Sequence, residues 1–157
     1  MNEQAFNRAL ERLAGSPASR FVLHREPMLF LDRLTAIGPE FAECEWEVRD
    51  DFALVVPGRG VPSYAGIEYM AQCVAVHSGA RAFVRGQEPP VGLLLGTRNY
   101  ECSVPYFEVG GRFRTVCQEQ VRDSQGMGSF TCRIEAENIV VAEASLAVFE
   151  TPDDSDE

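Results

Sequence analysis

One carboxylate stands out as a candidate general acid. Glu68 lies in the stretch 63–84, where Gln72 and His77 are the few other polar residues that we expect to be buried. Burying a charged carboxylate is costly, so we expect a raised pKa for Glu68. A carboxylic acid with a raised pKa can donate a proton at neutral pH. The alternative is a structural carboxylate that is bonded to an Arg or to the backbone.

The two histidines of the chain are its candidate bases. His77 follows Glu68 by nine residues, which is half a turn out of phase on a helix, so we expect His77 to point away from Glu68 and to be packed. His24 precedes the apolar stretch 27–37. It is therefore the candidate base within this chain.

The composition excludes several chemistries. All 14 basic residues are Arg, so the chain has no lysine for a Schiff base or for a P-loop. A formal net charge of −10 argues against nucleic acid as a partner. The five cysteines form no C-x-x-C pair, and we expect neither a disulfide framework nor a metal site. Cys73, in the stretch 63–84, is interpreted as a small hydrophobic residue rather than as a nucleophile.

The acid excess is concentrated at the C-terminus. Residues 150–157 contain five acids and no base, which predicts an acidic, disordered tail after a single domain over 1–149. No secretion signal and no apolar run of roughly 20 residues is found. We therefore expect a cytoplasmic protein without a membrane span.

Hydrophobic periodicity predicts one long buried helix together with several strands. The stretch 63–84 is apolar or small nearly all round, so it requires a covering on all sides. A curled antiparallel sheet wrapped around one central helix, an α+β architecture known as the hot-dog fold, satisfies this requirement. The predicted elements are a helix over 3–13 in an N-terminal extension (1–20), strands over 27–37 and 40–49, the helix over 63–84, and strands over 91–102, 111–122, 126–136 and 139–149.

Three segments carry a resemblance to a known family. The runs LHREPMLFLDR (23–33), Pro57-Gly58 and GIEYMAQ (66–72) resemble motifs of FabA/FabZ-type 3-hydroxyacyl-carrier-protein dehydratases. The longer run GVPSYAGIEYMAQ (60–72), together with LLGTR (94–98), is similar to the divergent branch of aryl polyene biosynthesis clusters. The resemblance covers roughly residues 23–149.

The resemblance implies loss of water from a 3-hydroxyacyl thioester to give a trans-2-enoyl thioester, without metal or redox cofactor. Glu68 matches the family's helix acid. The backbone amides of Ser63 and Tyr64 match its donors to the thioester carbonyl, although plain N-capping is the simpler role. Gly66 and Gln72 fall within the same substrate-binding motif.

The base is where this sequence departs from the family. The family's His lies two residues before the Pro-Gly pair, and that position is Val55 here. Because the family's active sites span a dimer interface, one hypothesis is that a hot-dog partner bearing the His completes the site. A homodimer that uses His24, a non-catalytic subunit that binds acyl groups or carrier protein, and a hot-dog thioesterase are the alternatives.

Two further expectations concern ligand contacts. Tyr64, Tyr69 and Met70 either line an acyl tunnel or belong to the core. The implied substrate is carried on an acyl carrier protein, which is acidic, so exposed arginines are candidates for docking it or its phosphopantetheine phosphate. The candidate docking residues are Arg81, Arg85, Arg112 and Arg114.

Overall fold

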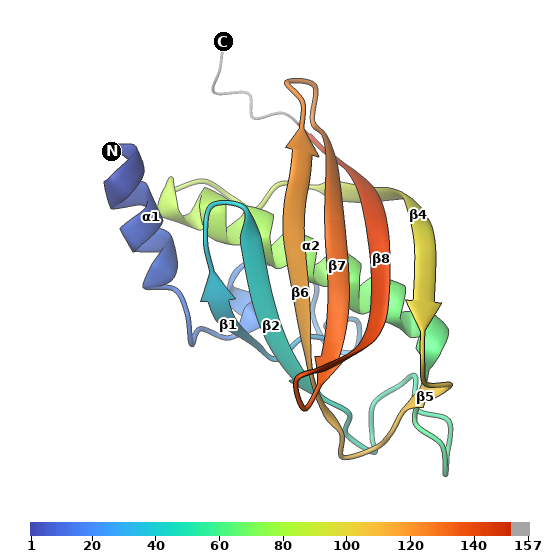
Figure 1. Ribbon diagram of the computed structural model, residues 1–157. Coiled ribbons are helices and arrows are strands. Elements are labelled where there is room, and N and C mark those ends of the chain that lie inside the picture. The colour runs from blue at the N-terminus through green and yellow to red at the C-terminus, as the bar shows by residue number, and fades with distance from the viewer. Residues whose placement is uncertain (152–157) are drawn as a thin grey trace.

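The structure is a computed structural model and describes residues 1–151. Six strands form one antiparallel sheet in the order β1-β2-β6-β7-β8-β4, and the long helix α2 crosses one face of this curved sheet (Figure 1). The predicted hot-dog architecture is thereby confirmed. The elements are α1 (Glu3–Glu11), a 3₁₀ turn (Ala18–Arg20), β1 (Arg33–Ile37), β2 (Phe41–Glu47), β3 (Val61–Pro62), a 3₁₀ turn (Ser63–Ala65), α2 (Gly66–Val84), β4 (Gly92–Cys102), β5 (Tyr106–Phe107), β6 (Arg112–Arg122), β7 (Met127–Ala136) and β8 (Ile139–Glu150).

The core lies between α2 and the concave face of the sheet. Tyr69 of α2 stacks on Trp46 of β2, with ring centroids 3.7 Å apart. Tyr69 and Met70 are both fully buried, so they belong to the core rather than to an acyl tunnel. A side chain at Gly79 would collide with the carbonyl oxygen of Phe21, because a Cβ atom there would lie 1.7 Å from it. This close approach locks α2 against the N-terminal segment.

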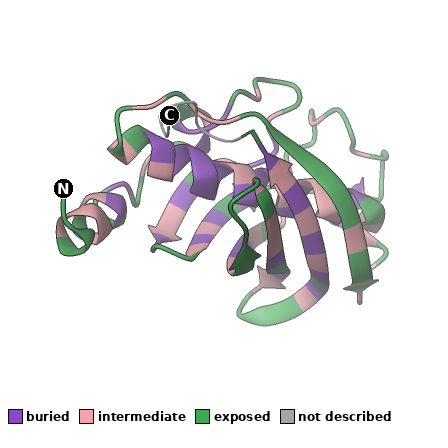
Figure 2. Cartoon of the chain, turned by 90° about the horizontal axis from the view of Figure 1, so that it is seen from above, coloured by how far each residue is buried: buried purple, intermediate pink, exposed green. Residues whose placement is uncertain are grey.

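The two edges of the sheet differ in how they are covered. β1 has five residues, and α1 packs beside it and against the end of α2. β4, at the other edge, has eleven residues, most of them exposed and none buried (Figure 2). Its exposed residues include Leu93, Leu94 and Leu95. An exposed, apolar strand edge offers a surface for pairing with another chain.

The predicted boundary between the domain (1–149) and its acidic tail (150–157) needs a correction. β8 continues through Glu150, which is buried, and the amide of Thr151 donates to the carbonyl of Val91. Glu150 therefore belongs to the sheet and not to the predicted tail. The rest of that tail, 152–157, lies outside the described residues. No helix among residues 1–151 combines the length and apolar character needed to cross a membrane.

Candidate functional site

Glu68 stands at the rim of a cavity, in the first turn of α2. Its side chain is 41% exposed, so the desolvation expected for an acid on an apolar helix is only partial. The expectation of a buried Glu68 is wrong, because the side of α2 that carries Glu68 lines an open cavity instead of packing against the sheet. The carboxylate can therefore meet a ligand without any movement of the core.

Gln72 holds Glu68 in place from one helical turn further along. Its Nε2 donates to Oε1 of Glu68 at 2.9 Å and to the carbonyl of Met28 at 2.8 Å, and its Oε1 accepts from the amide of Phe30 at 2.8 Å. Gln72 is 1% exposed. Its role in this geometry is to fasten the 26–30 loop to α2 and to orient the acid, rather than to offer a free group to a substrate.

His24 lies next to the same carboxylate. Its Nε2 is 3.9 Å from Oε1 of Glu68, and both side chains line the cavity. The other ring nitrogen, Nδ1, is buried and has no hydrogen-bond partner among the described residues. The structure thus brings together three of the predicted site residues, His24, Glu68 and Gln72.

The cavity itself is mainly apolar and encloses about 230 Å³. One wall is the face of α2 that carries Glu68, Ala71 and Ala75, and the opposite wall is formed by the 89–94 segment at the start of β4. Because β4 is the exposed edge of the sheet, this wall lies where a partner chain would pair. The predicted site therefore adjoins a surface suited to association.

The start of α2 is shaped by Tyr100 rather than by capping side chains. The hydroxyl of Tyr100 donates to the carbonyl of Ser63, and a Cβ atom on Gly66 would lie 2.2 Å from this hydroxyl. Gly66 is thus explained by the approach of Tyr100. The amide of Ser63 donates to the carbonyl of Pro105 at 3.0 Å, so it is already committed within the chain.

Tyr64, the other predicted amide position, is the outermost residue of this turn. Its side chain is 74% exposed, so it belongs neither to the core nor to the cavity wall described above. Its backbone amide has no acceptor among the described residues. Of the two amides predicted to polarise a thioester carbonyl, only that of Tyr64 is therefore available.

Val55 occupies the loop between β2 and β3, as expected for the position that replaces the family's His. It packs against the edge of the core, and its amide donates to the carbonyl of Phe52. Val55 supplies only apolar contact, so the base for this site must be another residue.

The four candidate docking arginines do not form one site. Arg112 and Arg114, at the start of β6, line a hollow of about 590 Å³, where Arg114 pairs with Glu43 and Glu135. Arg81 and Arg85 instead line a hollow of about 640 Å³ with Arg122, at the other end of β6. A strand rises roughly 3.3 Å per residue, so the two pairs lie at opposite ends of a strand roughly 33 Å long.

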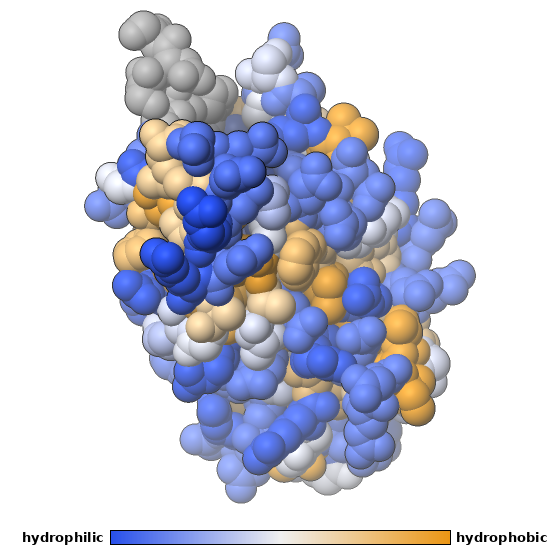
Figure 3. Space-filling view, turned by 60° about the vertical axis from the view of Figure 1, so that its left-hand side comes forward, coloured by the Kyte–Doolittle hydropathy of each residue, from blue (hydrophilic) through white to orange (hydrophobic). Residues whose placement is uncertain are grey.

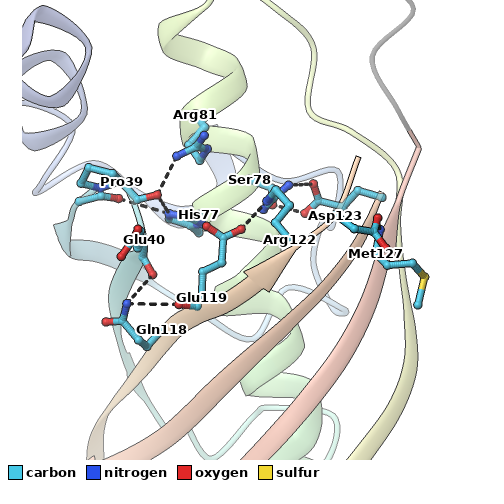
Figure 4. Close-up of polar contacts among 12 residues, drawn as sticks. Pro39, Glu40, His77, Ser78, Arg81, Gln118, Glu119, Arg122, Asp123 and Met127 are labelled. Carbon is cyan, nitrogen blue, oxygen red and sulfur yellow. Dashed lines mark hydrogen bonds and ion pairs between the residues drawn. The ribbon is translucent and has the colours of Figure 1, made fainter. Parts of the chain in front are cut away.

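His77 lies in a sealed polar cluster on the far side of α2 (Figure 4). Its Nε2 contacts the carbonyl oxygens of Gly38 and Pro39 at 3.2 and 3.1 Å, so this nitrogen carries the hydrogen. Burial, assisted by the charge of Arg81, lowers the pKa of His77 to about 4. The prediction that His77 is packed is confirmed.

Three other residues near this cluster, Ser78, Arg122 and Glu150, were missing from the predicted site. Ser78 donates to the carboxylate of Glu150, and Arg122 donates to the same carboxylate at 3.0 Å. Ser78 follows Glu68 by ten residues, which places the two about 80° apart around the helix axis, on the same half of the helix. This spacing was the available signal in the sequence, whereas the partnership with Glu150 depends on the sheet.

Cys73 is buried against the sheet. Its Sγ contacts the carbonyls of Ala42 at 3.5 Å and Thr115 at 3.4 Å. This position agrees with the interpretation of Cys73 as a small buried residue.

Comparisons with solved structures show both the fold and a closer relationship. The dehydratase heterocomplex ApeI:P from Xenorhabdus doucetiae matches with 26% identity and a TM-score of 0.81, covering 88% of this chain and 93% of that chain. The uncharacterized protein PH1136 from Pyrococcus horikoshii matches with 15% identity and a TM-score of 0.62, covering 90% and 98%. The PaaI protein of the E. coli phenylacetic acid degradation operon matches with 10% identity and a TM-score of 0.58, covering 74% and 77%. The last two show the fold alone.

The family assignment comes from a match to most of the chain. No curated protein matches. A protein-family model described as ApeP dehydratase matches residues 16–157, which includes every element that forms the cavity around Glu68. The chain therefore belongs to the ApeP-like dehydratase family of hot-dog proteins.

Proposed function

We propose that this protein is a subunit of a 3-hydroxyacyl thioester dehydratase, acting on acyl groups carried by an acyl carrier protein in polyene or fatty-acyl synthesis. The observation that carries the proposal is the placement of Glu68. This carboxylate occupies the position of the family's acid, reaches into a mainly apolar cavity, and is oriented by a fully buried Gln72.

The geometry around Glu68 suits proton donation to a departing hydroxyl. Its Oε1 accepts from Nε2 of Gln72, so Oε2 is the oxygen left to carry the proton. A base removes the proton from C2 of the substrate, the C3–O bond breaks, and the departing hydroxyl takes the proton from Oε2 and leaves as water. We assign the stabilisation of charge on the thioester oxygen to the amide of Tyr64, in the 3₁₀ turn before α2, because it has no acceptor among the described residues.

We further propose that the base comes from a second hot-dog chain. Val55 cannot accept a proton, and the cavity is walled by β4, whose edge and leucines are exposed. A partner that paired with β4 would bring its own loop to the cavity of this chain. The similarity to one chain of the ApeI:P heterocomplex supports a partner that is not identical.

A self-sufficient homodimer is the second candidate, because His24 lies 3.9 Å from Glu68. An imidazole in this position could take the proton from C2 while Glu68 donates to the hydroxyl. The two candidates differ in what His24→Ala does. Loss of the only base should lower turnover roughly 100-fold or more, whereas with a partner base the loss should stay below about tenfold.

The test is dehydration of a 3-hydroxyacyl carrier protein by this chain alone, by its hot-dog partner alone, and by the two after co-expression. The proposal predicts turnover by the complex and none by this chain alone, with His24→Ala retaining most of the complex's activity. Full turnover by the purified chain alone would refute the partner base. Hydrolysis of the thioester in place of dehydration would assign the protein to the thioesterases.

A further inference from the structure

Two arginines at the C-terminal end of α2 carry charge that no carboxylate of residues 1–151 neutralises. Arg85 is exposed and Arg81 is half-buried, and both line the same hollow as Arg122. Neither Arg81 nor Arg85 has a carboxylate oxygen within 4.0 Å in the described part of the chain. Arg122, by contrast, pairs with Glu119 and Glu150. The unpaired positive charge of this hollow is therefore that of Arg81 and Arg85.

Phe6 of α1 holds both guanidinium groups in place. They lie over its ring, with Arg81 and Arg85 5.4 and 4.8 Å from the ring centre. Arg81 also donates to the carbonyl of Pro39 at 2.7 Å (Figure 4). A guanidinium that lies over a ring still has N–H groups at its rim to donate. Both arginines can therefore bind an anion without giving up their contact with Phe6.

The negative charges that line the hollow are mostly engaged elsewhere. Asp123 accepts from two backbone amides of its own turn, and Glu150 pairs with Arg122. Glu88 is the remaining carboxylate among the described lining residues, and the end of α2 adds about half a negative charge. Burial, followed by the charges of two neighbouring arginines, lowers the pKa of Arg81, as expected where positive charge is concentrated.

An acidic segment of the chain begins at the wall of this hollow. Thr151 lines the hollow, and its amide donates to the carbonyl of Val91 at 3.2 Å. The six residues 152–157 that follow contain four acids and no base. An extended residue spans at most about 3.5 Å, so six residues can reach about 20 Å from Thr151. The acids can therefore reach side chains that line the same hollow.

We propose that the acidic segment 152–157 docks onto Arg81 and Arg85 of its own chain. Attachment at Thr151 gives the carboxylates a high effective concentration at the two arginines. Any other anion that enters the hollow must displace the segment, so the segment restricts access to the hollow at low salt and less so at high salt. Docking of this kind requires no dehydratase chemistry. Exposed ion pairs add little to folding stability, so its effect is on ligand access.

Charge, and not apolar burial, holds the segment in this proposal. Residues 152–157 contain no large apolar side chain. On the α1 side of the molecule, hydrophilic side chains cover most of the surface, and apolar side chains show between them only in small patches (Figure 3). The contact should therefore weaken steeply with salt.

The test follows the arginine side chains of the full chain by NMR. A neutral variant keeps the segment's length and carries Asp153→Asn, Asp154→Asn, Asp156→Asn and Glu157→Gln. At about 20 mM salt the Nε–Hε signals of Arg81 and Arg85 should differ between the wild type and this variant. At about 0.5 M salt they should coincide, because the Debye length falls from about 20 Å to about 4 Å. The signal of Arg112, at the other end of β6, should be the same in both proteins.

Titration with inorganic phosphate measures access to the hollow. Followed at Arg81 at low salt, phosphate should bind the neutral variant at least about threefold more tightly than the wild type. Arg85→Gln should remove most of this difference. Arg112→Gln removes the same charge at the other end of β6 and should preserve it.

Protein concentration separates the chain's own segment from that of a second copy. Tethering fixes the effective concentration, so the signal differences should survive dilution by about tenfold. Differences that shrink on dilution would place the segment on a second copy and overturn the proposal. Identical Arg81 and Arg85 signals in the wild type and the neutral variant at low salt, or an equally large difference at Arg112, would also overturn it.

Discussion

Two polar clusters on α2, about three turns apart, have opposite characters. The first joins Glu68 to Gln72 and His24 at the rim of a cavity, with Glu68 and His24 both about two-fifths exposed. The second contains His77 and the Ser78–Glu150–Arg122 group, all at or near full burial except for Arg122. Both contain a glutamate and a histidine, so residue type alone does not separate a reactive group from a structural one.

The two clusters differ in how many of their hydrogen-bonding atoms already have a partner within the protein. In the buried cluster the serine, the carboxylate and the guanidinium bind one another, so little is left for a ligand. In the open cluster Gln72 is fully used, while Glu68 keeps one oxygen without a hydrogen bond. A buried ring nitrogen without a partner among the described residues occurs in both clusters, at His24 and at His77. A catalytic site needs a reactive group that is oriented by a rigidly held neighbour and still has an atom free to bind a ligand. Glu68 and Gln72 form such a pair.

Gln72→Ala should have the largest effect on stability, because it leaves the buried amide of Phe30 and the part-buried carbonyl of Met28 without their partner. Each lost buried partner costs about 1–3 kcal/mol, so we expect the free energy of unfolding to fall by about 3 kcal/mol or more. Urea denaturation measures this loss. Gln120→Ala, at an exposed glutamine on β6, is the matched control and should cost less than about 0.5 kcal/mol.

The pH dependence of stability should report His77. The folded protein holds its pKa at about 4, below the usual 6.5, so the unfolded chain binds the proton first as the pH falls. Stability is therefore retained above pH 6.5 and lost between pH 6.5 and pH 4, by about 3 kcal/mol in total. Urea denaturation across this range should show a slope that His77→Gln flattens. If His24→Gln flattens the slope and His77→Gln does not, the assignment is wrong.

Removing a carboxylate charge should lower the free energy of unfolding more in the buried cluster than in the open one. Glu150→Gln weakens a buried pair with Arg122 and should lower the free energy of unfolding by about 1–3 kcal/mol. Glu68→Gln, at a partly exposed position, should change it by less than about 0.5 kcal/mol. Thermal unfolding of the two variants side by side tests the contrast. Similar losses in both would show that Glu68 is structural.

The smallest effect on stability and binding is expected from removing the acidic C-terminal segment. Residues 152–157 contain four acids and follow Thr151, which lines the hollow of Arg81 and Arg85. Ending the chain at Thr151 should leave stability unchanged and strengthen binding of the carrier bearing its arm a few-fold at low salt, but not at high salt. Ending it at Phe149 should destabilise the protein, since Glu150 is lost. Weaker carrier binding by the first truncation would contradict the charge argument.

Much of the fold could be predicted because its signals are local. The four long strands after α2, which are β4, β6, β7 and β8, begin and end within one residue of the ranges expected from alternation and turns, whereas the two-residue strand β5 was not predicted. The first predicted strand, 27–37, is instead a strand only from Arg33. Its first half forms the loop that hydrogen-bonds to Gln72, and that partnership joins residues 42 and 44 positions apart.

The parts of the site that lie on a single helix could be predicted from the sequence. The position of Glu68 on the helix, and of His77 on the opposite side, follows from helical spacing alone. The separation of Arg112 and Arg114 from Arg81 and Arg85 does not, because it depends on which end of β6 meets the end of α2. The exposure of Glu68 likewise depends on where the sheet stops covering the helix.

Turnover by the complete complex carrying Glu68→Gln tests the central claim most directly. The variant should be co-expressed with the wild-type hot-dog partner and assayed on a 3-hydroxyacyl carrier protein, with assembly checked by native mass. We predict an intact complex whose dehydration rate falls roughly 100-fold or more, as expected for loss of a general acid. An intact complex that retains the wild-type rate would show that Glu68 is not the acid of this dehydratase.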